Sequence, residues 1–584
     1  MGTISMNLSA FTWPGRAAGR RCATAAGMAL LAIVIVQLGG LLATARAEAP
    51  HDIVLPAPDQ VGPDVLLGAP DLPTAPPPNP QVGDSWVWWL WVHAPMPPHF
   101  EQRVCTVRGK SDHAYVVVEN TQWGVNITQA NVDAILERWE NTTIGPYADE
   151  GIYAINSQIF GQPPDELDND PRVYLMWFNF GISSDGFFFY FDEYPEGTFP
   201  GYHSNECETL YLNCGHGQSP QGDYMLSVVA HEFEHMIHWK YDEGEDSWVD
   251  EGLAELAMWF YGRPDVISAF NTNPDNSLIV WSGNWADYIK TYLWSLYFYE
   301  RYGGEPAVFD VVHEPANSIA GYEAVLDGLG YTENFADVFA DWTVANFLDN
   351  STIGDGRFGD VGAVLPAFSV AGTSTSYPVP ATTRTVNYWA ADYYRFRTFG
   401  ATPAIEWSFN GSDNNVFAVW CLVQRGTGTT SVLRMTLNPA TQTGSLPVGG
   451  LTHPDDQVIL VVASTSSAGS SSYVFSAQSA PAGLTEEEPF AGGSAAGLLR
   501  AWPNPAANEV RLAFADQPAS AIAPAIEIYD AGGRLVRRLA GAASGASVRW
   551  DGRDGSGVLL APGLYYARAR VGGEVVRSPI TLLR

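Results

Sequence analysis

Apolar residues follow a helical period in one central stretch of the chain. Residues 224–239 contain neither Gly nor Pro. Their apolar positions recur every three or four residues, at Leu226, Val229, Phe233 and Ile237. This spacing is typical of a helix with one face turned to a core. We therefore predict a helix over 224–239, capped at its start by Asp223, a residue type that favours helix N-termini.

Runs of aromatic and β-branched residues predict strands around this helix. The predicted strands are Ser85–Val92, Ala114–Val118, Val173–Phe178, Phe187–Phe191 and Leu210–Leu212. Helical spacing and end signals predict further helices at Thr128–Glu140, from Glu251 to about Tyr261, and at Tyr288–Tyr302, which Gly303-Gly304 stops. The mixture predicts an α+β domain over residues 83–360.

The period changes to short alternating runs after about residue 366. Runs such as Tyr393–Phe396, Phe417–Val423 and Val458–Val462 are separated by Gly, Ser and Thr turns, a pattern typical of a β-sandwich. We predict one β-sandwich over 366–480, a linker over 481–498, and a second over 499–584. The expected fold class is thus multidomain, an α+β domain followed by two β-sandwiches.

The N-terminus has the features of an export signal. Arg16, Arg20 and Arg21 precede an apolar run over 28–44, and the small-x-small segment 45–47 follows. This order predicts a signal peptide over residues 1–47, removed on export. A retained membrane anchor is the alternative, although the run is at the short end for a bilayer span. The Pro-rich residues 48–82 predict a linker or a short pro-segment.

Composition narrows the classes of partner. The 584 residues carry a formal net charge of −34, which disfavours binding to nucleic acid phosphates and to anionic membranes. The localisation we expect rests instead on the predicted signal peptide and is secreted or cell-surface.

The central helix carries a metal-ligating pattern. His231 and His235 are four residues apart, which places both imidazoles on one helix face where they can hold one ion. Glu232 follows the first histidine directly, as the general base of a metalloprotease does. A chance match on a helix with ordinary histidines is the alternative.

A catalytic zinc site needs a third protein ligand and one open position. Gly and His at 238 and 241 would continue a metzincin motif, but His238 and Tyr241 stand there. We assign Glu251, 16 residues after His235, as the third ligand. Glu255, one turn further, would accept a hydrogen bond from a ligand histidine. Asp250 is interpreted as a helix-start residue.

The segments HEFEHMIHW and SWVDEGLAELA resemble the gluzincin clan of zinc peptidases, in particular its hyicolysin-like branch. Residues 204–211, Tyr288 and the Tyr292-Leu293-Trp294 segment carry further likeness, and the resemblance covers roughly 85–350. It implies a zincin-like fold with His231, His235 and Glu251 on Zn²⁺. It also implies a Tyr donor for the oxyanion, which we place at Tyr288 with Tyr292 in reserve. An edge strand just before the helix, around Leu210–Leu212, would bind extended substrate.

Two secondary features remain open. Asp165, Asp168 and Asp170 are spaced like oxygen ligands of Ca²⁺, with a polar turn as the alternative. Four cysteines lie outside the signal peptide, Cys105, Cys207, Cys214 and Cys421, and their pairing is open. Cys207 and Cys214 bracket a predicted strand and could close a small loop.

The last stretch, Leu499–Arg584, resembles the immunoglobulin-like module of flagellar hook-capping proteins and of type IX secretion cargo. That resemblance implies passage across an outer membrane, or retention at the cell surface, with the secretion machinery as partner. The expected function is a secreted zinc endopeptidase acting on a protein or peptide substrate. The alternatives are an aminopeptidase, with Glu206 and Glu208 binding the free amine, and a non-catalytic adhesion protein.

Overall fold

The protein is described by a computed structural model that covers residues 60–67, 72–359, 362–400 and 404–480. In the C-terminal part it describes 499–502, 510–514, 525–530, 534–539, 548–555, 557–571 and 574–582. The predicted signal peptide, most of the Pro-rich segment before residue 72, and the linker 481–498 lie outside the described residues. Among the described helices, none has both the length and the apolar character needed to cross a bilayer.

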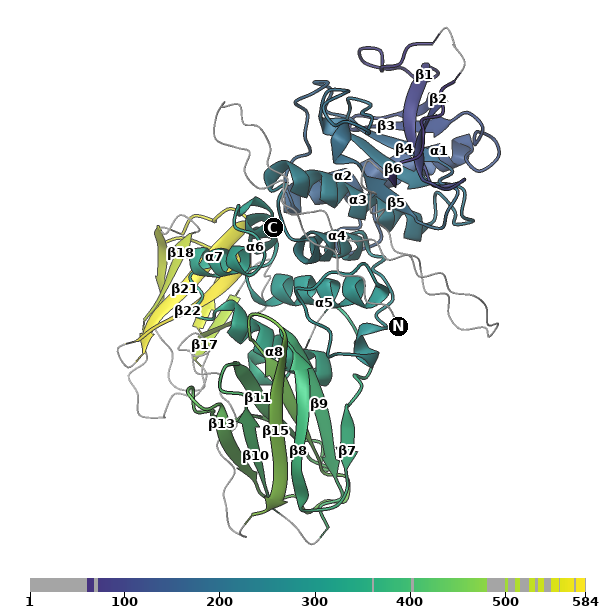
Figure 1. Cartoon of the computed structure of the whole chain (residues 1–584). Helices are drawn as coiled ribbons and strands as arrows, with labels where there is room; N and C mark the ends of the chain where they lie inside the picture. Colours follow the sequence, from purple (N-terminus) through teal and green to yellow (C-terminus); the bar gives the residue numbers. More distant parts are fainter. Residues whose placement is uncertain are drawn as a thin grey trace, which may run out of the picture.

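The N-terminal part is built on one six-stranded sheet with the order β1-β2-β3-β4-β6-β5 (Figure 1). Its strands are β1 (Ser85–Val92), β2 (His99–Lys110), β3 (Ala114–Glu119), β4 (Val173–Phe178), β5 (Gly186–Phe188) and β6 (Thr209–Asn213). The central strands β3, β4 and β6 run parallel, whereas β1, β2 and β5 are antiparallel to their neighbours. All residues of the three parallel strands are buried, because the sheet is covered on both faces.

Successive residues of the central strands enter two different cores, as the pleat requires. Val116, Leu175 and Leu210 face the helices, and Tyr174 and Tyr211 face an aromatic core on the other side. The tryptophans of β1 fill that second core, which explains why a strand so rich in aromatic residues is stable here.

Eight α-helices lie within the described residues. They are α1 (Gln129–Glu140), α2 (Ile152–Ile159), α3 (Asp223–Tyr241), α4 (Ser247–Tyr261), α5 (Trp285–Arg301), α6 (Glu305–His313), α7 (Ile319–Leu329) and α8 (Phe335–Leu348). Helices α3, α4 and α5 pack in sequence, and α3 also contacts the sheet through β5 and β6 (Figure 1). The sequence did not predict α2 or α6 to α8.

Several predicted elements differ in their bounds, and two of the differences have a clear local cause. The central helix begins at Asp223 itself, with Gly222 as its cap. The strand expected over Phe187–Phe191 ends at Phe188, and a 3₁₀ turn over Tyr190–Glu193 follows. The chain turns there because the buried Asp192 carboxylate accepts hydrogen bonds from the Asn205 amide and the Tyr211 hydroxyl.

The four cysteines are all free and buried, so the suggested loop between Cys207 and Cys214 is wrong. The extended strand β6 lies between these two residues. At about 3.3 Å per residue it separates them by about 20 Å, whereas a disulfide requires Cα atoms within about 7 Å.

The first β-sandwich follows the helices. One sheet has the order β13-β10-β15-β8 and the other β12-β11-β14-β9-β7. The strands are β7 (Gly372–Ser374), β8 (Val379–Asn387), β9 (Ala390–Arg397), β10 (Ile405–Gly411), β11 (Phe417–Gln424), β12 (Thr430–Arg434), β13 (Thr443–Val448), β14 (Gln457–Ser464) and β15 (Ser470–Ser479). The outer face of the second sheet joins the helical core through residues such as Tyr393 and Trp420. The sandwich is therefore packed into the α+β part instead of standing beside it.

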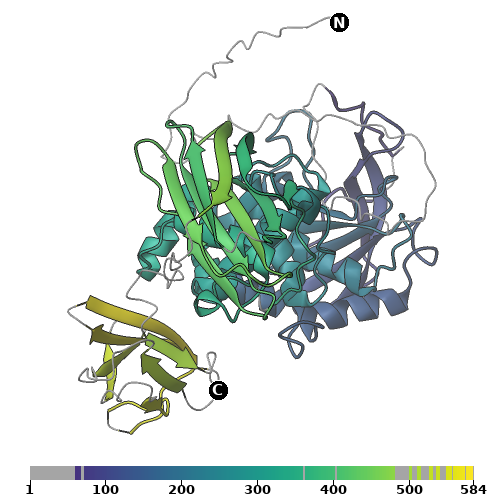
Figure 2. The ribbon, with the colours of Figure 1, turned by 90° about the horizontal axis from the view of Figure 1, so that it is seen from below.

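The C-terminal strands form two small sheets around a core of their own (Figure 2). Their orders are β16-β17-β20 and β19-β18-β21-β22. The strands are β16 (Leu499–Trp502), β17 (Val510–Phe514), β18 (Ile526–Asp530), β19 (Leu535–Leu539), β20 (Val548–Trp550), β21 (Gly563–Val571) and β22 (Glu574–Leu582). The observed architecture is thus mixed α+β followed by two β-sandwiches.

Candidate metal centre

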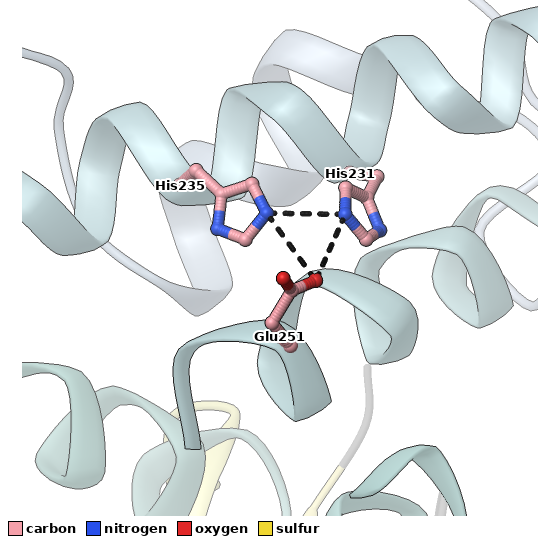
Figure 3. Close-up of side chains that lie close together, drawn as sticks. All are labelled: His231, His235 and Glu251. Carbon is pink, nitrogen blue, oxygen red and sulfur yellow. Dashed lines mark hydrogen bonds and ion pairs between the residues drawn. The ribbon is translucent and has the colours of Figure 1, made fainter. Parts of the chain in front are cut away.

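Helix α3 is buried on nearly every side. The run from Met225 to His238 is buried without a break, since the helix lies between the sheet, α2, α4 and α6. His231 and His235 lie one turn apart, on the side that faces α4 (Figure 3). Because both rings are held in a packed core, their positions are fixed before any ligand arrives.

Helix α4 brings carboxylates to this face. It begins after Asp246 and ends at Gly262, whose left-handed conformation closes the last turn. The other side of α4 packs close to α5, because Gly252 has no side chain that would hold the two helices apart. A Cβ atom at this glycine would lie 2.9 Å from the carbonyl oxygen of Thr291.

Three ligand-type atoms converge between the two helices (Figure 3). The Nε2 atoms of His231 and His235 are 3.1 Å apart. The Oε2 atom of Glu251 lies 3.6 Å from the first and 3.8 Å from the second. A tetrahedral zinc ion with bonds of about 2.0–2.2 Å separates its ligand atoms by about 3.3–3.6 Å. The observed separations of 3.1 and 3.8 Å lie on either side of this range and that of 3.6 Å at its upper limit, so small side-chain shifts would let the three residues hold one zinc ion.

The outward nitrogens of both histidines meet carboxylates. His231 Nδ1 lies 3.5 Å from Oε1 of Glu255, the residue predicted for this role. His235 Nδ1 lies 3.1 Å from Oδ1 of Asp250. Such contacts direct the Nε2 lone pair toward a metal and fix the ring orientation. Sequence reasoning placed Asp250 only at the helix start. The structure puts it in the first turn and also against His235, which its position directly before Glu251 could have indicated.

Glu232 is a residue of α3, and its side chain packs against the edge strand β5. Its side chain is fully buried. A Cβ atom built on Gly186 of β5 would approach Oε1 of Glu232 to 2.8 Å and Cγ to 2.9 Å. The carboxylate thus lies directly against the strand that ends the sheet. Gly186 carried no recognisable signal in the sequence.

The edge position belongs to β5. The predicted substrate-binding edge around Leu210–Leu212 forms β6, which is paired on one side with β4 and on the other with β5. That prediction was wrong, because the short strand β5 returns antiparallel and covers the exposed side of β6. Among the described strands of this sheet, β5 is the outermost one on this side, next to Glu232.

A second polar group surrounds the residue that precedes Gly186. The buried Asp185 accepts a hydrogen bond of 2.6 Å from the Tyr224 hydroxyl and pairs with His216 Nε2. The start of β5 is thereby tied to the first turn of α3. None of these three residues was singled out from the sequence.

The pKa values of three ionisable groups near His235 are strongly shifted. Burial raises the pKa of Glu234. Burial alone would lower the pKa of His238, but hydrogen bonding and charge from Asp250 and Glu234 raise it to about 10. Burial also opposes ionisation of Asp250, yet the charges of His235 and His238 outweigh it and lower the pKa of that carboxyl. His238 is therefore buried between the carboxyl groups of Glu234 and Asp250.

The tyrosines proposed as oxyanion donors are buried in α5. Tyr288 packs edge-on against Trp281, with ring centroids 4.7 Å apart, and lies 6.1 Å from Trp285. Tyr292 is part of the central hydrophobic core. Their role in stabilising an oxyanion stays a prediction.

Two of the three predicted calcium ligands, Asp168 and Asp170, contact other groups of the protein. Asp170 accepts a hydrogen bond of 2.6 Å from the Tyr115 hydroxyl and pairs with Arg172 at 2.7 Å. Asp168 accepts the backbone N–H of Asp170 at 2.7 Å. Within the described ranges, the groupings of three or more metal-ligating side chains are His231–His235–Glu251 and Glu234–His238–Asp250. Calcium binding by Asp165, Asp168 and Asp170 stays a prediction.

The two carboxylates considered for a free amine have different surroundings. Glu206 is tied to the backbone N–H of Glu196 on the surface. Glu208 is buried, and this burial together with the charge of Asp168 raises its pKa to about 9. Binding of a free amine by Glu206 and Glu208 stays a prediction.

Comparison with known proteins assigns the C-terminal segment. The family described as FlgD Ig-like domain matches residues 504–573. This match confirms the immunoglobulin-like module predicted there. No curated protein sequence matches the chain.

Three solved structures show limited similarity. PorZ, a surface component of the type IX secretion system of Porphyromonas gingivalis, is 18% identical over 21% of this chain and 15% of PorZ, with a TM-score of 0.13. Dimeric latent PorU from Porphyromonas gingivalis is 16% identical over 31% of this chain and 18% of PorU, with a TM-score of 0.15. The BSP domain of a biofilm associated protein is 8% identical over 36% of this chain and 53% of that domain, with a TM-score of 0.13. The chain spans less than two thirds of each, and TM-scores this low indicate no shared overall fold.

Proposed function

We propose that this chain is a secreted zinc-dependent endopeptidase of the gluzincin type. The observation that supports the proposal most directly is the convergence of His231 Nε2, His235 Nε2 and Glu251 Oε2 within 3.1–3.8 Å between two buried helices. A structural role alone would not require Glu232 beside this cluster, buried against a free strand edge.

Different residues would bind the metal, transfer the proton and orient the metal ligands. His231, His235 and Glu251 would hold the zinc ion. When bound, this ion supplies Lewis acidity and makes water acidic enough to react near neutral pH. Glu232 accepts a proton from the attacking water and delivers it to the leaving amine. Glu255 and Asp250 hold the two histidine rings with Nε2 directed inward.

The substrate would bind as an added strand. The backbone of β5 is a free sheet edge, and an extended peptide can pair with such an edge. A peptide paired along Gly186 would pass directly over Glu232. Such pairing would need no free N-terminus on the peptide, which is why we favour an endopeptidase over an aminopeptidase.

The test is metal content and hydrolysis by the purified full-length chain. We expect one zinc per chain and chelator-sensitive cleavage of peptides blocked at the N-terminus. Glu232→Gln should keep the zinc and lose at least about two orders of magnitude in rate. Normal turnover by this variant would refute the role of Glu232, and cleavage restricted to free N-termini would favour the aminopeptidase.

The C-terminal module supports a separate step, export or surface attachment. The FlgD Ig-like match over residues 504–573 and the predicted signal peptide favour a protein that passes the outer membrane or stays on its surface. Deleting residues 499–584 should leave hydrolysis intact and change the distribution between cell surface and medium. An unchanged distribution would reduce the module to a structural cap.

A further inference from the structure

A second group of ligand-type side chains lies beside the metal centre. Glu234 and His238 are four residues apart on α3, and their partner on α4 is Asp250. This is the spacing of His231, His235 and Glu251, displaced by three positions on α3 and by one on α4. Residues three and four apart share one helix face, so both groups lie in the same contact between α3 and α4.

One carboxylate oxygen connects the two groups. Oδ1 of Asp250 lies 3.1 Å from Nδ1 of His235 and 3.2 Å from Nδ1 of His238. Nδ1 of His238 also lies 3.4 Å from Oε1 of Glu234. The side chains of His238 and Glu234 are fully buried. Asp250 is therefore held from both sides, by a predicted metal ligand and by a buried imidazole.

The burial of Glu234 and His238 limits the positions that these two side chains can take. A buried carboxylate is costly unless a positive or hydrogen-bonding partner compensates it. His238 supplies that partner to the buried Glu234, and the same nitrogen also faces Asp250, whose side chain is 36% exposed. Because His238 is enclosed by the core, its contact with Oδ1 of Asp250 favours the position in which this oxygen faces Nδ1 of His235. That contact fixes which nitrogen of His235 carries the proton and leaves Nε2 for a metal.

We propose that His238 and Glu234 are positioning residues of the metal centre, which hold Asp250 against His235 and so fix the orientation of this ligand. The inference rests on the proposed function, because it requires that His235 binds a metal. It extends that function by a further layer of residues that do not touch the ion.

The experiment measures zinc affinity on the full-length apo chain, by competition with a chromophoric chelator. His238→Gln should weaken zinc binding about 10- to 100-fold, the range found when groups behind a ligand are removed. Asp250→Ala should weaken it to a similar degree. The double variant should bind no more weakly than Asp250→Ala alone, because His238 acts through Asp250. Glu234→Gln, which keeps the shape of the side chain, should show a smaller loss and serves if His238→Gln does not fold.

The control is His216→Gln, at a histidine whose side chain is only 7% exposed and pairs with the buried Asp185 outside this cluster. It should leave the zinc affinity unchanged. Thermal unfolding of each apo variant separates lost stability from lost affinity, since a purely structural role would lower the midpoint without changing the affinity of the folded protein.

Several results would overturn the proposal. Additive losses in the double variant would show that His238 does not act through Asp250. Two zinc ions per wild-type chain, reduced to one by His238→Gln, would make His238 a ligand of a second ion. Unchanged affinity in His238→Gln would refute the inference alone, whereas a wild-type chain that binds no zinc would refute the proposed function as well.

Discussion

Gly186 on the edge strand and Glu232 on helix α3 lie so close that a side chain at position 186 has no space. A Cβ atom there would lie 2.8 Å from Oε1 of Glu232 and 3.0 Å from Cγ1 of Val228. The nearest atoms belong to the flexible end of Glu232. An added methyl group would therefore displace the carboxylate more readily than it would displace the strand.

This relationship predicts the effect of Gly186→Ala. We expect kcat to fall by at least about tenfold, since small misplacements of a catalytic group can cost 10²-fold. Zinc content should stay at the wild-type level, because the three ligands lie on α3 and α4. The matched control is Gly328→Ala in α7, where a Cβ atom meets nothing within 4 Å. Unchanged kcat in Gly186→Ala would show that Glu232 is not confined by the strand.

Glu255→Gln tests the second carboxylate behind the ligands. The variant keeps the shape of the side chain but removes the charge that faces Nδ1 of His231. Zinc affinity, measured by chelator competition, should fall about 10- to 100-fold. Glu137→Gln on the exposed side of α1 should leave it unchanged. Equal affinities in wild type and Glu255→Gln would remove Glu255 from the centre.

The core shared by α8 and the first β-sandwich predicts that the two parts unfold together. Trp389 packs against Phe335 and Phe339 with ring centroids 4.9 and 5.2 Å away. Trp389→Ala should lower the free energy of unfolding by about 3–5 kcal/mol, the usual range for a buried Trp. Val364→Ala, at a residue that is 90% exposed, should change it by less than about 0.5 kcal/mol. If Trp389→Ala instead unfolds in urea in two transitions, with the transition of the helical part at its wild-type position, that result would contradict a shared core.

The buried Asp192 predicts how stability depends on pH. Burial raises its pKa to about 7, against the effect of hydrogen bonds from Tyr211 and Asn205. The folded protein therefore keeps a proton that the unfolded chain loses near pH 4. This contribution to stability is complete below about pH 4 and is lost as the pH rises to about 7.

In Asp192→Asn the side chain at position 192 is neutral at every pH, so the variant does not show this loss of stability. Between pH 5 and pH 8, the wild-type free energy of unfolding should fall by about 1–3 kcal/mol more than that of the variant. Urea unfolding of the metal-free chain at both pH values measures the difference. The control is Asp327→Asn, at an exposed position. A wild type that gains stability relative to Asp192→Asn with rising pH would show that Asp192 is ionised in the folded protein.

The sequence predicted much of the fold because local patterns carry it. The strands Ser85–Val92 and Val173–Phe178 have the predicted bounds, since runs of aromatic and branched residues favour extended chain. Helix α1 begins at the predicted cap, Thr128. The FlgD Ig-like match over 504–573 agrees with the module predicted from the C-terminal strands and turns.

The spacing of His231 and His235 was sufficient to place two imidazoles on one helix face, because helical geometry fixes what lies four residues away. Spacing could not show that Asp250 faces both His235 and His238, or that Gly186 lies against Glu232. These contacts join separate elements, and their geometry depends on how α4 and β5 pack against α3. In the same way, β6 had the right sequence for an edge strand, but the return of β5 placed it inside the sheet. Local periodicity thus determined the elements and the candidate ligands, whereas long-range packing decided which side chains surround them.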